Sequence, residues 1–481
     1  MSIHVPRRAL NHAFVVLLVL NCWLSPLVHH FAVDKSRQRL LCLLLDVALD
    51  FIGSIGISVV LATTYIRQFD FQYLYFPLDM HYTDKAFVNY VNEMQIILLS
   101  TWTDAVGRLV FSLGLLVGLS DVKTLIVSRT SHAVAPAPGP QLSFTVFEVK
   151  PKYSRFVLWC HRIIAVYGAT ILVTFIYAEL GDTANACGIP VRPWLTRQKG
   201  CALLEVNCHP RVIGRVESAN AAKMRDILSA IDAPSLAQLS LRHCHDVEII
   251  PELQRFRSIL AMKLFNVTVL SWPTEAALHR DYHQRITKVY VVHTKFPGHA
   301  LPPGLLSPLF PISLSDVEFS FTNLRSLPSN LHELWHKKMV LYFEFAEMSY
   351  LPASLAKLET DQLSLNGNPF ESVPADLLVS PGLDYLAFAF SSIDKLPAMV
   401  DTRNITVLRK LRFEHTDVSE LPPWMDEQFL SEHDVYAAET PFCRRLLTRN
   451  ETSAGLARVD CTDISETAYP LHVEQRDDES W

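Results

Sequence analysis

One segment of the sequence has residue types and spacing that match a zinc-dependent hydrolase. HELWH (332–336) fits the pattern HExxH, which on a helix holds zinc with two histidines and activates water with the glutamate. The segment directly follows Pro328, however, and Leu331 and Leu334 have the spacing of buried residues in a repeat arm. No third histidine follows at the usual spacing. We therefore expect a structural arm and no enzymatic activity.

A second group, His243, Cys244 and His245, also has metal-ligating residue types. Adjacent residues alternate sides along a strand, so a single ion would seldom bind all three. We interpret Cys244 as a capping cysteine between surface histidines. The sequence lacks a GxxxxGK[ST] loop, a GxSxG motif and kinase segments. We expect no metal and no cofactor, and a net charge of −6 without a basic stripe disfavours nucleic-acid binding.

The elements that must position these residues are leucine-rich repeats (LRRs). Proline recurs from Pro251 to Pro422 at intervals of 22 to 29 residues, and most of these prolines follow apolar residues at positions −11, −9, −4 and −1. In the repeat DQLSLNGNPFESVPADLL, the apolar residues point inward and Asn368 lies at the turn. One strand and its return arm cannot bury an apolar face alone, so neighbouring repeats stack. The pattern predicts an α/β solenoid of about eight repeats over 236–430, with a parallel concave sheet.

The outward positions of these strands form the predicted ligand-binding face. Aromatic side chains among mixed charges suit a protein or peptide ligand, and a glycan is also compatible. The predicted residues are Lys263, Phe265, Lys288, Tyr290, Glu318, Tyr342, Glu344, Asn366, Tyr385, Arg412 and Glu414.

Six cysteines at the two ends of the repeat array predict disulfide-tied caps formed in an oxidising compartment. They are Cys187, Cys201, Cys208, Cys244, Cys443 and Cys461. Pairing in the N-terminal cap (181–235) stays open. In the C-terminal cap (431–465), we expect Cys443 to pair with Cys461, with Cα atoms roughly 4.4–6.8 Å apart. Residues 466–481 are expected to be a disordered acidic tail.

Residues 1–180 contain four hydrophobic segments that are long enough, or nearly so, to cross a bilayer. They lie at 12–28, 43–66, 96–119 and 156–178. The first is interrupted by Pro26 and is alternatively a signal-peptide core. With loops 31–39 and 120–155 in the cytoplasm, eight basic residues lie inside and four outside. This orientation places both termini outside, with the glycosylation candidates Asn266, Asn404 and Asn450.

The segment CGIPVRPWLTRQKGCALLEVNC (187–208) resembles the entry segment of an oomycete family of multi-pass LRR membrane proteins. The resemblance rests on Pro193-Trp194, the cysteine spacing, the first repeat and TPFC (440–443), and it covers roughly residues 187–445. It implies an uncharacterised, receptor-like surface protein without established chemistry. More remotely, the architecture is similar to that of volume-regulated anion-channel subunits, which join four spans to cytoplasmic LRRs.

Together these patterns predict a transmembrane helical bundle followed by an LRR solenoid, in a multi-pass plasma-membrane protein. We expect the extracellular solenoid to bind a protein, peptide or glycan in a receptor-like or adhesion-like role. A co-receptor or a homo-oligomer is compatible with this prediction. The alternative is a channel-like membrane subunit with a cytoplasmic regulatory LRR domain.

Overall fold

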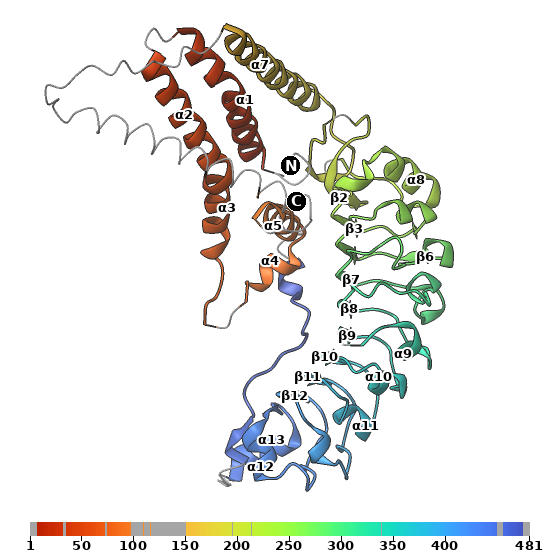
Figure 1. Cartoon of the computed structure of the whole chain (residues 1–481). Helices are drawn as coiled ribbons and strands as arrows, with labels where there is room; N and C mark the ends of the chain where they lie inside the picture. The colour runs from red at the N-terminus through yellow and green to blue at the C-terminus, as the bar shows by residue number, and fades with distance from the viewer. Residues whose placement is uncertain are drawn as a thin grey trace, which may run out of the picture. The chain divides into compact units, whose positions relative to one another are not determined.

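The structure is a computed structural model of the chain (Figure 1). It describes residues 7–31, 35–72, 75–97, 109, 116, 151–194, 196–212, 214–337, 339–449 and 456–474. The chain forms two units. The helical unit comprises 1–80, 89–182 and 191–197, and the repeat unit comprises 81–88, 183–190 and 198–481.

The helical unit is built from apolar helices. They are α1 (Arg8–Phe31), α2 (Lys35–Phe51), the π-helical turn η1 (Ile52–Gly56), α3 (Ile57–Ile66) and α7 (Pro151–Glu179), while α4 (Leu78–Tyr82) and α5 (Asp84–Ile97) belong partly to each unit. Val15 and Val19 of α1 form a buried cluster with Ile171 of α7. Gly168 permits this close approach, because a Cβ there would lie 2.7 Å from Cβ of Cys22.

Within the described residues, two helices are long and apolar enough to cross a membrane. They are Arg8–Val28 and Leu158–Glu179, and they match the first and fourth predicted spans. The second predicted span, 43–66, runs from α2 through the π-helical turn η1 into α3 without a break in the helical backbone; within it, Ile57–Ile66 is a shorter apolar helix. The third, 96–119, lies almost entirely outside the described residues. The bundle of four spans therefore stays a prediction.

The repeat unit is a solenoid built on one 12-stranded sheet, with its short helices on the outer side (Figure 1). β1 pairs antiparallel with β2, and every later neighbour pairs parallel. The strands are β1 (Cys187–Pro190), β2 (Cys201–Asn207), β3 (Gln238–Arg242), β5 (Ala261–Phe265), β7 (Lys288–Val292), β8 (Asp316–Ser320), β9 (Val340–Glu344), β10 (Gln362–Ser364), β11 (Tyr385–Ala387), β12 (Lys410–Arg412), β13 (Asp434–Tyr436) and β14 (Val459–Asp460). Each predicted repeat contributes one strand from β3 to β12, which confirms the repeat pattern.

The remaining elements complete the repeat arms and the caps. A small second sheet joins β4 (Val247–Glu248) to β6 (Val269–Ser271). The α-helices are α8 (Ala221–Ala230), α9 (Leu331–Leu334), α10 (Ser354–Lys357), α11 (Ala375–Leu378), α12 (Glu427–Glu432) and α13 (Pro441–Arg449). The 3-10 turns are η2 (Ala233–Ser235), η3 (Pro251–Arg255), η4 (Thr274–Ala276), η5 (Pro297–His299), η6 (Pro303–Leu305), η7 (Thr402–Asn404) and η8 (Leu456–Arg458).

The residues predicted to point inward form the core between sheet and arms. Leu363 and Leu365 are fully buried, and Phe370 is 1% exposed. The side-chain amide of Asn368 donates to the carbonyl oxygens of Phe343 and Leu365, at 2.6 and 2.8 Å. The turn asparagine therefore satisfies backbone groups of two neighbouring repeats, as its position in the pattern predicts.

Three disulfides tie the ends of this core. Cys187 pairs with Cys201 and Cys208 with Cys244, which resolves the pairing of the N-terminal cap. Cys443 pairs with Cys461 with Cα atoms 5.5 Å apart, which confirms the predicted C-terminal bridge. These bridges hold β2 to the first repeat and α13 to the end of the sheet.

Candidate binding site on the concave face

The predicted binding residues do share one face of the sheet. Parallel register places Lys263, Tyr290, Glu318 and Tyr342 side by side on consecutive strands. Nine of the eleven predicted residues are buried, however, and only Lys288 and Tyr385 are half-buried. Two other parts of the chain cover most of these residues.

The first covering part is the tail segment, which we define as residues 466–474. Asn366 donates to the carbonyl oxygen of Glu466 at 3.3 Å. The Glu344 carboxylate accepts from the main-chain N–H groups of Ala468 and Tyr469, at 2.7 and 3.2 Å. The segment thus crosses the strands in reverse order, from the C-terminal repeats toward the first (Figure 1). The prediction of a disordered tail does not hold for these residues, because Tyr469 is fully buried.

The second covering part is the loop segment, which we define as residues 81–88. The hydroxyl of Tyr82 donates to the Glu318 carboxylate at 2.8 Å, and its carbonyl oxygen accepts from the Lys263 ammonium at 2.6 Å. Asp84 accepts from the side chains of Gln238 and Ser240, at 2.7 and 2.8 Å. These contacts join residues more than a hundred positions apart in the sequence.

Four charges form a buried cluster where the two segments meet the solenoid. Asp84 of the loop segment lies 3.0 Å from both Arg242 and Lys263. Glu474 of the tail segment lies 3.1 Å from Arg242 and also forms an ion pair with Lys263. Burial alone would raise the pKa of Asp84, but Lys263 and Arg242 outweigh it and hold that pKa below its usual value. The solenoid contributes both cations and the covering segments both anions.

Aromatic and apolar side chains surround this cluster. Tyr82 stacks on Tyr290 with ring centroids 5.0 Å apart, and Tyr469 meets both rings edge-on. Phe265, Val292 and Val473 complete the buried group. Because Tyr469 touches residues of both the solenoid and the loop segment, the two segments stabilise each other.

Two buried carboxylates of the solenoid contact the covering segments, Glu318 the loop segment and Glu344 the tail segment. Burial and the neighbouring Asp316 raise the pKa of Glu318 well above its usual value. Burial also raises the pKa of Glu344, while hydrogen bonds from Ser364 and the tail main chain act in the opposite direction. The burial of the Glu344 carboxylate is unfavourable by itself, and hydrogen bonds from two hydroxyls and two main-chain N–H groups compensate for it. Such a carboxylate is suited to bind the main chain of a peptide.

Sequence reasoning missed both covering segments. The tail has only a weak signal, namely the apolar residues Tyr469, Leu471 and Val473 next to an acidic end. For the loop segment, the only signal is the negative charge of Asp84, which is opposite to the charges of Arg242 and Lys263. No sequence pattern near Asp84 indicates that it pairs with these distant residues. Pairings between distant residues leave no periodicity in a single sequence.

A row of rings lies at the ends of the strands, and we call it the aromatic rim. It consists of His293, Phe321, Phe345, Phe390 and His415, each with a positive φ between 45° and 58°. Successive ring centroids lie 4.8, 4.6, 6.1 and 4.5 Å apart. All five rings are partly exposed. Left-handed backbone is unfavourable for bulky residues, so stacking along the rim must offset this cost.

Gly367 occupies the same left-handed position between two rings of the rim, with φ of 70°. An added Cβ would lie 2.4 Å from the ring of Phe345. We expect Gly367→Ala to lower the free energy of unfolding by about 1–3 kcal/mol through overpacking, measured as a shift of the urea midpoint. Gly298→Ala is the matched control, since Gly298 has φ of 68° and nothing within 4 Å. Equal losses in both variants would show that the ring contact is unimportant.

The HELWH segment forms part of a repeat arm, where it overlaps the short helix α9. α9 ends at Leu334, so His336 does not lie one helical turn from His332. The His336 ring instead bonds the carbonyl oxygen of Leu314 at 2.7 Å. Among the described residues, no group of three His, Cys, Asp or Glu side chains is arranged to hold a metal ion. His243 and Cys244 are likewise separated, with Cys244 in its disulfide.

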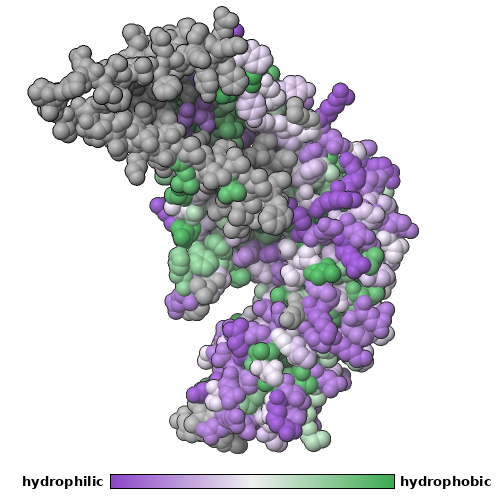
Figure 2. Space-filling model, in the orientation of Figure 1, coloured by the Kyte–Doolittle hydropathy of each residue, from purple (hydrophilic) through white to green (hydrophobic). Residues whose placement is uncertain are grey.

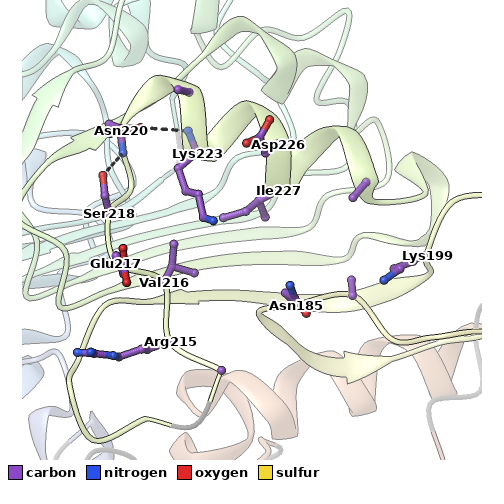
Figure 3. Close-up of a pocket in the computed structure, with 14 residues that line it drawn as sticks. Asn185, Lys199, Arg215, Val216, Glu217, Ser218, Asn220, Lys223, Asp226 and Ile227 are labelled. Atoms are coloured by element: carbon purple, nitrogen blue, oxygen red, sulfur yellow. Dashed lines mark hydrogen bonds between the residues drawn. The ribbon is translucent and has the colours of Figure 1, made fainter.

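Outside the concave face, a hollow of about 830 Å³ lies in the N-terminal cap. Its polar side chains include Lys199, Arg215, Lys223 and Asp226 (Figure 3). Asn220 beside them accepts from the main-chain N–H of Lys223 and so caps α8. The visible outer side of the repeats is mostly hydrophilic (Figure 2). The concave face is therefore the better candidate site.

Comparison with known proteins adds little to this geometry. No protein-family model and no curated protein matches the chain. Among solved structures, it is similar to an LRR protein of Leptospira interrogans, with 19% identity, a TM-score of 0.38, and coverage of 48% of this chain and 55% of that one. Internalin C2 of Listeria monocytogenes has 16% identity and a TM-score of 0.29, covering 47% and 78%. A plant ice-binding protein has 14% identity and a TM-score of 0.32, covering 51% and 82%.

Proposed function

We propose that this chain is a multi-pass membrane surface protein whose LRR solenoid binds a protein or peptide on its concave face, without catalysis. The observation that supports this most is that the face already holds two polypeptide segments, 81–88 and 466–474. It holds them through carboxylate and amide contacts to main-chain groups and through buried ion pairs. A face that recognises chain segments in this way has the chemistry needed to recognise a partner.

The loop segment supports the proposed topology. It docks on the solenoid, so both must lie on the same side of the membrane. The predicted spans 96–119 and 156–178 separate them in the sequence, and two crossings return the chain to its original side. The three disulfides favour an oxidising compartment. These observations agree with the orientation from loop charges and with the resemblance to oomycete surface proteins.

Glycosylation tests the sidedness. Asn266 and Asn404 are exposed, and Asn450 lies outside the described residues. We expect the full chain, expressed in eukaryotic cells, to lose mass on glycosidase treatment, because its sequons face the secretory lumen. The mobility shift should shrink in Asn404→Gln and Asn450→Gln, and it should persist in the control Asn330→Gln, which is in no sequon. A chain without glycan, whose cap cysteines react with a cytosolic alkylating reagent, would favour the channel-like alternative.

A further inference from the structure

We infer that the concave face is a site for a partner protein's segment bearing a tyrosine and, five residues later, a carboxylate, and that the tail segment occupies this site in cis. The inference rests on the proposed function and adds to it the ligand class and its regulation. Tyr469 and Glu474 of the tail segment supply the two recognised groups. The solenoid and the loop segment form the walls of the site.

One part of the site binds only main-chain groups of the bound segment, so it does not select among that segment's side chains. Glu344 accepts from two successive N–H groups, and Asn366 donates to a carbonyl oxygen two residues before the first of them. Any extended polypeptide can offer these three groups. Glu344 in turn accepts from the hydroxyls of Ser320 and Ser364, at 3.2 and 2.5 Å, which fixes the direction of its carboxylate. This part of the site sets the position and direction of the bound segment.

The side-chain part of the site is selective. The tyrosine ring fits edge-on against Tyr82 and Tyr290, and its hydroxyl donates to Glu474 at 2.5 Å. Glu474 is 1% exposed and lies against Arg242 and Lys263. Without a carboxylate at this place, Lys263 would keep Asp84 and Arg242 would keep Asp84 and the neighbouring Glu205, so the two buried cations would lose a carboxylate that pairs with both of them, which is unfavourable. The occupant must therefore be acidic at this position.

The tail segment is attached in a way that allows exchange. The disulfide between Cys461 and Cys443 fixes the chain five residues before the segment, and the segment packs against the solenoid through the apolar side chains of Tyr469, Val473 and Leu471. Glu466 and His472 are exposed even when it is docked. A short tether gives the tail a high effective concentration, so a partner must bind more tightly than an untethered copy of the tail. The tail thereby sets a minimum affinity that a partner needs in order to displace it.

Peptide binding to a tail-free chain tests the inference. The probe is a fluorescent synthetic peptide of residues 463–474, titrated against the full chain ending at residue 462 in detergent micelles and against the intact chain. We expect saturable binding to the truncated chain that is at least tenfold tighter than to the intact chain. A Glu474→Gln peptide should bind at least tenfold more weakly, whereas the matched Glu466→Gln peptide, which loses an exposed charge, should bind normally.

A second variant keeps the test informative if truncation impairs folding. The full-length chain with Tyr469→Ala and Glu474→Gln has a weakened tail, so the wild-type peptide should bind it more tightly than it binds the intact chain. A folded, tail-released chain that does not take up the peptide, equal affinity of the two Gln peptides, or unfolding of both variants would overturn the inference. So would a dimer of the intact chain that disappears on truncation, since it would assign the site to tail exchange between copies. None of these outcomes changes the glycosylation result, on which the proposed sidedness depends.

Discussion

Lys263→Met is expected to lower the free energy of unfolding of the repeat unit by about 3–5 kcal/mol, because it removes one partner from a buried ion cluster. Lys263 is 1% exposed and pairs with both Asp84 and Glu474. In the variant, these two carboxylates would share Arg242 alone. The urea midpoint of the chain in micelles measures the global loss, and hydrogen exchange of residues 466–474 measures release of the tail.

The control for this variant is Lys295→Met, which removes an exposed lysine and should change stability little. Adding Glu474→Gln to Lys263→Met should recover much of the loss, since one cation and one anion then remain.

The effect of pH on the stability of the cluster has a definite sign. The lowered pKa of Asp84 gives stability that is present above about pH 4 and lost as the pH falls through the lowered value. The difference between variant and wild type should therefore shrink on acidification, and a pH-independent difference would contradict this account.

The repeat core could be predicted because its information is local and periodic. Leu363, Leu365 and Phe370 recur at fixed distances from a proline, and each repeat restates the same pattern. The C-terminal bridge could be predicted by a different route. The pattern fades after Pro422, the last apolar layer needs a cover, and Cys443 and Cys461 lie in the segment that directly follows.

The occupied state of the concave face could not be predicted, because it depends on pairings without local pattern. Arg242 meets Asp84 across 158 positions and Glu474 across 232. Each of these residues, seen alone, is an ordinary surface charge. The register correctly grouped the side chains of the face, but an amphipathic strand has the same sequence whether water or another segment covers its polar side.

The second large effect that we expect is a loss of stability when either of the two disulfides that close the longer loops is removed. Replacing both Cys208 and Cys244 by alanine should cost about 4 kcal/mol, and replacing both Cys443 and Cys461 about 3 kcal/mol, because a bridge restricts the unfolded chain more when its loop is longer. The sequence separations are 36 and 18 residues. Urea midpoints under non-reducing conditions measure both losses. Cys22→Ala, which removes a free cysteine, is the control, and a larger loss for the C-terminal pair would contradict the loop-length argument.

The two disulfide variants should also differ in where they loosen the protein. Cys461 fixes the start of the chain that leads to the tail segment, so loss of its bridge lowers the effective concentration of the tail at the concave face. Hydrogen exchange of residues 466–474 should then rise more than that of β9 and β10. In the N-terminal variant, exchange should rise first in β2 and β3, which Cys208 and Cys244 join. If tail exchange stayed unchanged without Cys461, the bridge would contribute nothing to the docking of the tail, and the main chain alone would set its effective concentration at the concave face.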